Sequence, residues 1–333
     1  MTAERFALGR IGIRARIWSG RRIGGDKLAA LAALAALGVW VAPSPFPDAV
    51  LSETQTEERT SVSAPGDGTG TTPAMRTEHK FGGYGGVSYT HPSAVRIVNP
   101  GVTDLTASDF GWIGRPFKSP IYYGLRTQHW QPGALTGSMV DFTHAKAIAK
   151  ADDVASFSGT LNGEPVPPTA KVGDVFRHLE FSHGHNILTL NGVFRTPGSW
   201  LPVRPYFGLG GGASLPHTEV GLRAEAPKRT YEYQFAGFAG QVLAGIEVPL
   251  GRVSLFFEYK FTYAPYSVPL SHEPYGWLFV TDVWRQFRAW MTGEKPPGGV
   301  LTTTLASHHG ISGLLVRVSP GAPAKRPPAG PQR

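Results

Sequence analysis

Residues 230–264, TYEYQFAGFAGQVLAGIEVPLGRVSLFFEYKFTYA, decide the fold of this chain. In the second half of this stretch one parity is apolar or aromatic: Val253, Leu255, Phe257, Tyr259, Phe261 and Tyr263. The other parity carries Ser254, Phe256, Glu258, Lys260 and Thr262. This alternation predicts a β-strand with one apolar and one mostly polar face. The first half is a Gly- and Ala-rich strand joined to the second by a short turn around Pro249 and Gly251, so the stretch predicts a long hairpin.

The length of these strands favours a membrane barrel. A usual strand has roughly 5–6 residues, whereas about 9–11 residues cross a bilayer as a tilted strand. In a membrane barrel the apolar face points outward and the interior can be polar. The alternative is a soluble, lipocalin-like barrel whose apolar face points inward.

Composition narrows the class of protein. The 333 residues include 42 Gly, 29 Pro and no Cys, which favours an all-β domain with long loops and excludes disulfides and thiolate chemistry. The net charge is +8, but much of the basic excess lies in the N-terminal stretch and the C-terminal tail. No helix–turn–helix, RNP-like or zinc-finger pattern accompanies it, so we expect no nucleic-acid partner.

Four segments are predicted along the chain. Residues 1–42 contain the apolar run LAALAALAALGVWVA behind basic residues and are predicted to be an export signal or an N-terminal anchor. Residues 43–79 are predicted to be a disordered linker and residues 319–333 a disordered tail, because both are rich in polar residues and Pro. Residues 80–318 are predicted to form the barrel.

Eight strands are expected within the barrel segment: 81–91, 120–130, 138–148, 185–195, 203–214, 230–248, 252–264 and 302–318. Long connections follow the odd strands and short ones follow the even strands. Segregated loop lengths are typical of outer-membrane barrels, so we predict an all-β, eight-stranded antiparallel up-and-down transmembrane β-barrel with long loops on one rim. We expect a monomer in the outer membrane of a Gram-negative bacterium. The loop 265–301 carries GWLFVTDVWRQFRAWM, which predicts an amphipathic helix at the membrane interface or a helix over the barrel mouth.

Polar residues gather where four consecutive strands meet the long-loop rim. They come from DFTHAK, HLEFSHGHN, LPHTEV and YEYQ, and they include His144, Lys146, His178, Glu180, Asn186, His217, Glu219, Glu232, Tyr233 and Gln234. Imidazole and carboxylate together can bind a divalent ion or perform acid–base catalysis. His183 and His185 are predicted to project from one face of a strand as a chelating pair.

A second polar group is predicted inside the barrel: Arg126, Asp141, Asn191, Arg195, Arg204, Glu258 and Lys260. A narrow barrel interior needs paired charges, so we interpret Arg126, Glu258 and Lys260 as mainly structural.

Several blocks resemble the lipid A oxidase family of rhizobium-type outer membranes: DFTHAK at 141–146, HLEFSHGHNILTLN at 178–191, PYFGLGGGASLPHTEV at 205–220, TYEYQFAG at 230–237 and FFEYK at 256–260. The resemblance implies an eight-stranded outer-membrane barrel. It also implies O2-dependent oxidation of the proximal glucosamine of 1-dephosphorylated lipid A to 2-aminogluconate, with release of hydrogen peroxide. His183, His185 and the proline-rich C-terminal tail depart from the family pattern.

Lipid A fills the outer leaflet at the depth of the long-loop rim, so we predict the site there. The predicted catalytic residues are His144, Glu180, His217, Glu232 and Gln234, and the predicted substrate-binding residues are Lys146, Asn186 and Tyr233. A divalent metal ion of open identity is predicted on His178, Glu180, His217 and Glu219, with O2 as electron acceptor. The partners implied are lipid A, or lipopolysaccharide, and the outer membrane. The alternative function is a non-catalytic small barrel with a role in adhesion or envelope integrity.

Overall fold

A computed structural model describes residues 77–131, 133–197, 202–271, 279–294 and 298–318. The chain divides into two compact units, Met1–Glu53 and Thr54–Arg333, and every described residue belongs to the second. The predictions for the export signal, for nearly all of the linker and for the tail lie outside the described residues. Glu78 and His79, which we assigned to the linker, already belong to the first strand.

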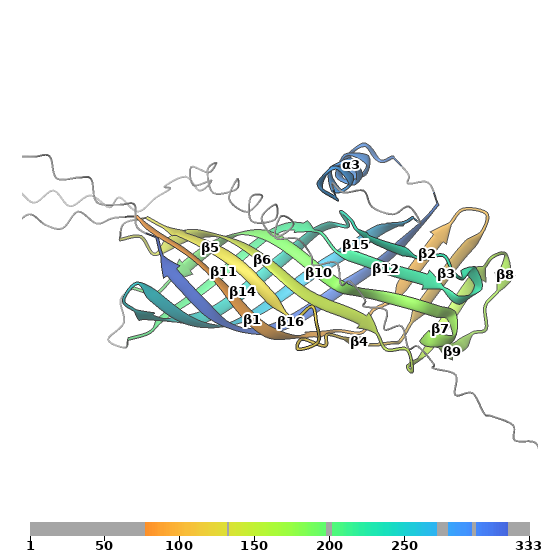
Figure 1. The fold of residues 1–333 in the computed structure, drawn as a ribbon, viewed down its shortest axis with the longest axis horizontal. Coiled ribbons are helices and arrows are strands. Elements are labelled where there is room, and N and C mark those ends of the chain that lie inside the picture. Colours follow the sequence, from red (N-terminus) through yellow and green to blue (C-terminus); the bar gives the residue numbers. More distant parts are fainter. Residues whose placement is uncertain (1–76, 132, 198–201, 272–278, 295–297, 319–333) are drawn as a thin grey trace, which may run out of the picture. The chain divides into compact units, whose positions relative to one another are not determined.

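Eight antiparallel strands form a closed ring (Figure 1). Their order around the ring is β1 (Glu78–Thr90), β5 (Tyr123–Trp130), β6 (Thr136–Ala149), β10 (Phe176–Arg195), β11 (Arg204–Ser214), β14 (Gly237–Leu250), β15 (Val253–Leu270) and β16 (Gly299–Arg317). Pairing of β16 with β1 closes the ring. The predicted eight-stranded antiparallel barrel is confirmed.

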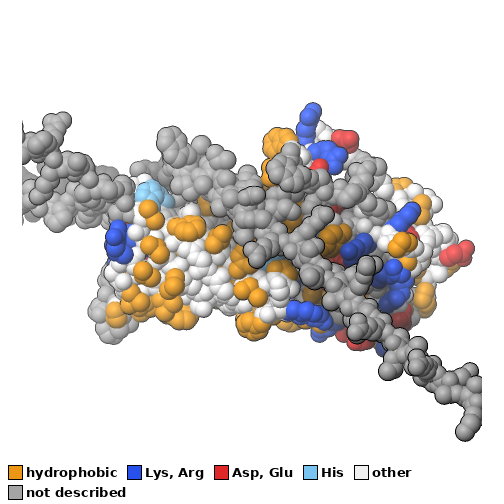
Figure 2. All heavy atoms as spheres, in the orientation of Figure 1, with side chains coloured by type: hydrophobic (Ala, Val, Ile, Leu, Met, Phe, Trp, Pro, Cys, Tyr) orange, Lys and Arg blue, Asp and Glu red, His pale blue; other side chains and the backbone are white. Residues whose placement is uncertain are grey.

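The outer face of the ring is apolar. Exposed large apolar side chains project from all of these strands except β5 and β6, and they include Phe81, Val87, Leu190, Phe207, Leu209, Val242, Ile246, Phe257, Tyr259, Leu314 and Val316. Figure 2 shows such side chains spread over the barrel wall. On β15 the alternate residues Glu258 and Lys260 are buried inside. An apolar outside and a charged inside match a membrane barrel and exclude the soluble alternative.

Paired charges fill the interior. Arg126 donates to both carboxylate oxygens of Glu258 at 2.7 and 2.8 Å and to Asp141 Oδ1 at 3.1 Å. Lys260 Nζ donates to Asp141 Oδ2 at 2.5 Å. Tyr206 donates to Glu258 Oε2 at 2.7 Å. The interior of this small barrel is thus occupied by side chains, as expected for eight strands.

The connections that we predicted as long loops contain further strands. β2 (Val95–Asn99), β3 (Thr103–Ser108) and β7 (Val154–Leu161) continue the sheet from β16, and β7 also pairs with β8 (Glu164–Pro165) and β9 (Thr169–Lys171). β4 (Trp112–Ile113) pairs with β6. β12 (His217–Leu222) pairs with β10, and β13 (Thr230–Tyr233) pairs with β12. The short helical turns are α2 (Val172–Val175) and η2 (Arg223–Glu225).

These added strands build an extension of the barrel on the long-loop side. The extension has its own apolar core, which includes Val95, Ile97, Leu105, Phe181, Leu301 and Leu305. It also divides the predicted strand 230–248. Residues 230–233 form β13, and β14 begins only at Gly237, whose positive φ of 116° suits glycine. The extension therefore moves several predicted site residues away from the ring itself.

Helix α3 (Phe279–Thr292) occupies the predicted helical segment. Trp290 packs against Phe235 and Phe238, and Phe287 also packs against Phe235. Trp284 and Met291 are exposed. In the part of the chain that the structure describes, no helix has the length and apolarity needed to traverse a bilayer.

Candidate active site on the outer wall

His144 lies on the outer face of β6. Its neighbours Asp141 and Thr143 contact Lys260 inside the barrel, so the alternation of β6 turns His144 and Lys146 outward. His144 pairs in register with Asn186 of β10, and its ring stacks on that of Tyr123 at a centroid distance of 4.7 Å. Lys146 donates to the backbone oxygen of Lys118 at 2.6 Å.

The hydrogen bonds of Asn186 determine which nitrogen of His144 carries the proton. Asn186 Nδ2 donates to the Leu215 backbone oxygen at 3.1 Å, so Asn186 Oδ1 is the atom that faces His144 Nδ1 at 2.8 Å. An amide oxygen only accepts, and Nδ1 must therefore donate. In the neutral ring this leaves the lone pair on Nε2. His144 Nε2 is buried and has no hydrogen-bond partner among the described residues.

His144 lies at the edge of the apolar belt, the ring of exposed apolar side chains on the outer face, on the side of the long loops. Along β6 the outward residues change from Val140 and Phe142 to His144 and Lys146. On β10 they change from the exposed Leu190 to Asn186. Because polar side chains on the outer wall begin where lipid tails end, these residues lie at the depth of lipid headgroups.

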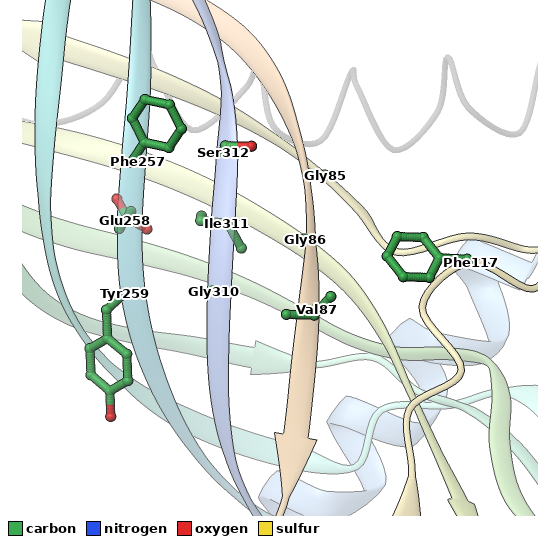
Figure 3. A pocket seen from close by; sticks show the side chains of 10 residues that line it. All are labelled: Gly85, Gly86, Val87, Phe117, Phe257, Glu258, Tyr259, Gly310, Ile311 and Ser312. Carbon is green, nitrogen blue, oxygen red and sulfur yellow. The ribbon is translucent and has the colours of Figure 1, made fainter.

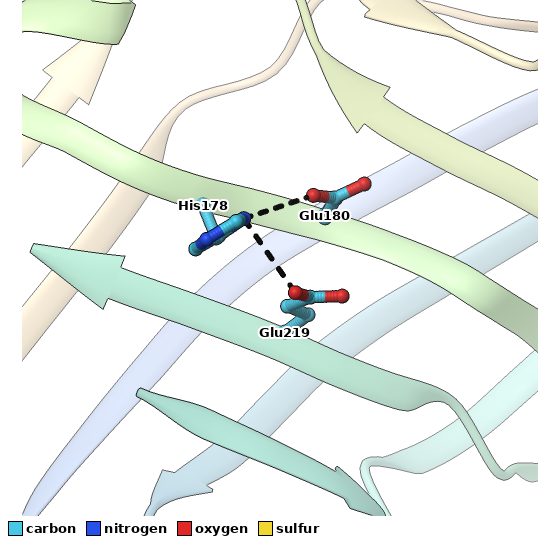
Figure 4. A group of neighbouring side chains, drawn as sticks. All are labelled: His178, Glu180 and Glu219. Atoms are coloured by element: carbon cyan, nitrogen blue, oxygen red, sulfur yellow. Dashed lines mark hydrogen bonds and ion pairs between the residues drawn. The ribbon is translucent and has the colours of Figure 1, made fainter. Parts of the chain in front are cut away.

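A compact imidazole–carboxylate group lies further up on β10 and β12. His178 Nδ1 is 3.3 Å from Glu180 Oε1 and 3.5 Å from Glu219 Oε1 (Figure 4). One ligand atom from each residue lies within 4.8 Å of the other two. Register explains the convergence, since Glu180 pairs directly with Glu219 and His178 pairs with Gly221. One imidazole nitrogen and two carboxylates suit a divalent cation. Arg229, 2.6 Å from Glu219 Oε1, competes for that carboxylate.

His217 lies beside this group but is not one of its three members. Its ring is 4.9 Å from that of His183 and 4.7 Å from that of Tyr233. Burial lowers the pKa of His217 to about 3, so the ring is neutral at physiological pH. Of the four predicted metal ligands, only His178, Glu180 and Glu219 lie close enough together to share one ion. His183, which we had not assigned to the metal, has Nδ1 at 4.0 Å from Glu219 Oε2.

The predicted chelating pair of His183 and His185 is wrong. The register of β10 shifts between Phe181 and His185, and Gly184 has a φ of 138°. This irregularity sends the two rings to opposite faces of the strand. His183 faces Glu219 outside, whereas His185 Nδ1 is hydrogen-bonded to Tyr266 OH in the interior.

Glu232 and Gln234 do not join the other predicted catalytic residues. In the β12–β13 register His217 is opposite Tyr233, and Glu232 is opposite Thr218 on the other face. Gln234 Nε2 donates to Glu232 Oε1 at 2.9 Å and to the Pro269 backbone oxygen at 2.7 Å. Ser271 also donates to Glu232, and burial raises the pKa of this carboxyl. Tyr233, the predicted substrate contact, remains on the outer face with His217.

Three residues at the site were missed by sequence reasoning. Tyr123 stacks on His144, Arg229 binds Glu219, and the Tyr231 ring is 4.5 Å from that of His217. Only Tyr123 could have been found from the sequence, because it lies at the start of a strand predicted to pair with the strand of His144. Arg229 and Tyr231 follow from the pairing of β12 with β13, which the sequence did not predict.

The closed ring, the lipid-facing belt and the filled interior define an integral outer-membrane β-barrel. No family model matches the chain, and no curated protein matches it. Among solved structures, Neisserial surface protein A is 9% identical, with 73% of this chain and 97% of that chain covered and a TM-score of 0.31. The outer membrane protein AlkL is 13% identical, with 81% and 100% covered and a TM-score of 0.35. Likeness at this level does not extend to function.

Proposed function

We propose that this protein is an outer-membrane enzyme that oxidises the proximal glucosamine of 1-dephosphorylated lipid A to 2-aminogluconate. The observation that supports this most is His144, whose Nε2 is buried at the headgroup level without a hydrogen-bond partner among the described residues. A buried imidazole nitrogen without a partner is costly in stability, and such a cost is often kept for function. The resemblance of blocks such as DFTHAK and HLEFSHGHNILTLN to the lipid A oxidase family suggests the substrate class.

The position of the candidate site suits a substrate that arrives through the membrane. Asn186, His144 and Lys146 lie directly above the apolar belt, and all three are buried. A lipid diffusing along the outer wall would reach them once the side chain of Tyr123 moves aside. Its sugar would reach these residues without leaving the bilayer and without entering the filled interior. The outer wall at the long-loop rim is therefore the proposed place of reaction.

The reaction balances with O2 as the acceptor. The C1–H bond and the O–H bond of the sugar hemiacetal break, and two electrons and two protons pass to O2. The products are a lactone and hydrogen peroxide. Water then opens the lactone to the aminogluconate, so the lipid gains one oxygen atom overall.

His144 is the proposed base for the hemiacetal hydroxyl, with Nε2 as the accepting atom. Asn186 holds the ring in the required tautomer through Nδ1. Tyr123 is only partly buried where it stacks on His144, and its side chain must move to admit the sugar. Lys146 and Tyr233 are proposed to contact the lipid headgroup.

His178, Glu180 and Glu219 are the residues proposed to hold a divalent metal ion. A redox-active metal would supply one-electron chemistry with O2 when bound. His178 and Glu180 are partly exposed and Glu219 is buried, so an ion could reach the group from solvent through the first two residues. The contact between Arg229 and Glu219 would weaken when Glu219 binds the metal.

The proposal is tested by expression in a Gram-negative host whose lipid A lacks the 1-phosphate. We expect lipid A to gain the mass of one oxygen atom and the membranes to release hydrogen peroxide. Glu180→Gln should abolish the gain, whereas Glu225→Gln in the exposed turn η2 should not. A folded, heat-modifiable barrel that leaves lipid A unchanged would reject the proposal.

A non-catalytic role in adhesion or envelope integrity is the second candidate. The observation that favours it is the fold itself, because a small barrel with a filled interior and a structured extension requires no chemistry. Under this alternative the lipid A mass stays constant and loss of the protein alters adhesion or envelope permeability.

A further inference from the structure

A groove runs along the outer wall over β15, β16 and β1 (Figure 3). Two consecutive rows of outward residues form it. In one row Gly310 lies between Tyr259 and Val87, and in the next Ser312 lies between Phe257 and Gly85. The middle strand thus carries small residues while its neighbour β15 carries aromatic ones. The result is a trough with a low floor along β16.

The groove has a volume of about 610 Å³, which lies within the roughly 300–1,000 Å³ range of small-molecule sites. Phe257 and Tyr259 form one wall, and Val87 and Phe117 form the other (Figure 3). Phe117 is 84% exposed and, with Phe257, Tyr259 and Val87, forms part of one apolar patch.

The glycines of β1 and β16 fall into two groups, those that close packing requires and those on the floor of the trough, which it does not require. At Gly82 a Cβ would lie 1.8 Å from the Leu314 backbone oxygen, and at Gly86 it would lie 2.5 Å from that of Gly310. Those two glycines are needed by the interior. At Gly85 and Gly310 the nearest atom to a Cβ is 4.0 and 3.8 Å away. The trough is therefore a property of the outer surface alone.

The loop that carries Phe117 is held in place and is cationic. Tyr122 N donates to the Pro116 backbone oxygen at 2.8 Å, and Lys146 binds the backbone oxygen of Lys118 at 2.6 Å. Arg115 and Lys118 are exposed on either side of Phe117. Two cations beside an apolar residue match a lipid with an anionic headgroup.

The long-loop end of the groove is also polar. His308, the next outward residue of β16, is hydrogen-bonded to Tyr259 OH at 2.6 Å and to His91 at 2.7 Å. The opposite end continues into Leu314, which is exposed and apolar. A lipid in the groove therefore has one orientation, with its headgroup toward the long loops.

We propose that this groove binds one acyl chain of an anionic membrane lipid, whose phosphate group contacts Arg115 and Lys118. The site goes beyond the proposed oxidation and holds whether or not the lipid is oxidised. Tyr123, which stacks on His144, follows this cationic loop directly, so the bound lipid lies next to the candidate active site.

The test is native mass spectrometry of the full chain in detergent micelles containing dipalmitoyl phosphatidylglycerol or dipalmitoyl phosphatidylcholine. Gly310→Leu and Ser312→Leu fill the trough. Gly240→Leu is the matched control, because Gly240 faces outward on β14 with no atom within 4 Å of a Cβ. Lys118→Gln removes a headgroup contact, and Lys171→Gln replaces an exposed lysine elsewhere. Heat-modifiability confirms that each variant is folded.

We expect one phosphatidylglycerol molecule to stay on the wild type, Gly240→Leu and Lys171→Gln. The bound phosphatidylglycerol should be lost from Gly310→Leu and Ser312→Leu. Lys118→Gln should retain phosphatidylglycerol no better than it retains phosphatidylcholine. The proposal is overturned if the wild type retains no lipid, or if the folded trough variants retain it as Gly240→Leu does. Unchanged preference for phosphatidylglycerol in Lys118→Gln would overturn the headgroup contact.

Discussion

Two groups of titratable residues lie on opposite sides of the same barrel wall. Inside, Arg126 and Lys260 neutralise Glu258 and Asp141 at distances of 2.5 to 3.1 Å. Outside, His144 has a ring nitrogen without a partner in the described chain, and His178 approaches two carboxylates no closer than 3.3 Å. Satisfied charges stabilise a fold, whereas unsatisfied ones remain available to bind or react. His185 in the interior also has an Nε2 without a partner in the described chain, so the outward position of His144, together with its free nitrogen, marks it as the candidate functional residue.

The largest expected effect comes from breaking the interior group. Arg126→Ala leaves Glu258 and Asp141 with a missing partner in a fully buried site, which costs roughly 3–5 kcal/mol of unfolding free energy. Urea unfolding of the barrel in micelles measures this. The matched control is Arg96→Ala, because the Arg96–Asp104 ion pair is exposed to solvent and its removal should change the stability little. Equal effects of the two substitutions would contradict a structural interior.

The next largest effect is expected at His144. In His144→Gln the side-chain amide can still donate to Asn186, but it offers no basic nitrogen. Loss of a general base lowers the rate about 10²-fold or more, while stability should change little. The rate of lipid A oxidation per folded barrel measures this. His129→Gln, on β5 near the short-turn rim, is the control, and equal rates in both variants would exclude His144 as the base.

Removal of one proposed ligand should weaken metal binding. Glu219→Gln takes away the carboxylate shared by His178 and Arg229, and we expect the affinity for Co²⁺ to fall by at least about tenfold. Calorimetric titration of the purified barrel checks this result. Glu225→Gln, on the exposed turn η2, should bind Co²⁺ as the wild type does. Identical affinities in the two variants would remove the metal from this site.

The smallest effect on oxidation is expected at the strand irregularity that positions Asn186. In Gly184→Ala the new Cβ would lie 2.2 Å from Asn186 Oδ1, at a φ of 138° that disfavours side chains. We expect a loss of about 1–3 kcal/mol of stability from backbone strain and a partial loss of oxidation, smaller than in His144→Gln. Full activity would show that the Asn186–His144 contact does not position the base.

The ring of eight strands was predictable because its signal is local. Alternation in residues such as Phe257, Glu258 and Tyr259 identifies a strand and its two faces, and segregated loop lengths set the order. The pairing of Arg126 with Glu258 was predictable only as a need for neutrality, because their positions are distant in sequence.

The site was harder to predict because it depends on register in the extension. A single irregularity at Gly184 separates His183 from His185, and the division of one predicted strand at Gly237 moves Glu232 to the inner face. Strands as short as β12 and β13 have too few residues for alternation to be read. The proximity of His178, Glu180 and Glu219 was predicted, because it depends only on which strands are neighbours.

The central claim is that chemistry takes place on the outer wall and not in the interior. The most direct test is the rate of lipid A oxidation per folded barrel for Glu180→Gln and Glu258→Gln. We predict that Glu180→Gln folds normally and loses oxidation, whereas Glu258→Gln lowers the folded fraction and the molecules that do fold keep the wild-type rate. The opposite pattern, with oxidation intact in Glu180→Gln and lost from folded Glu258→Gln, would contradict the claim and place the site in the interior.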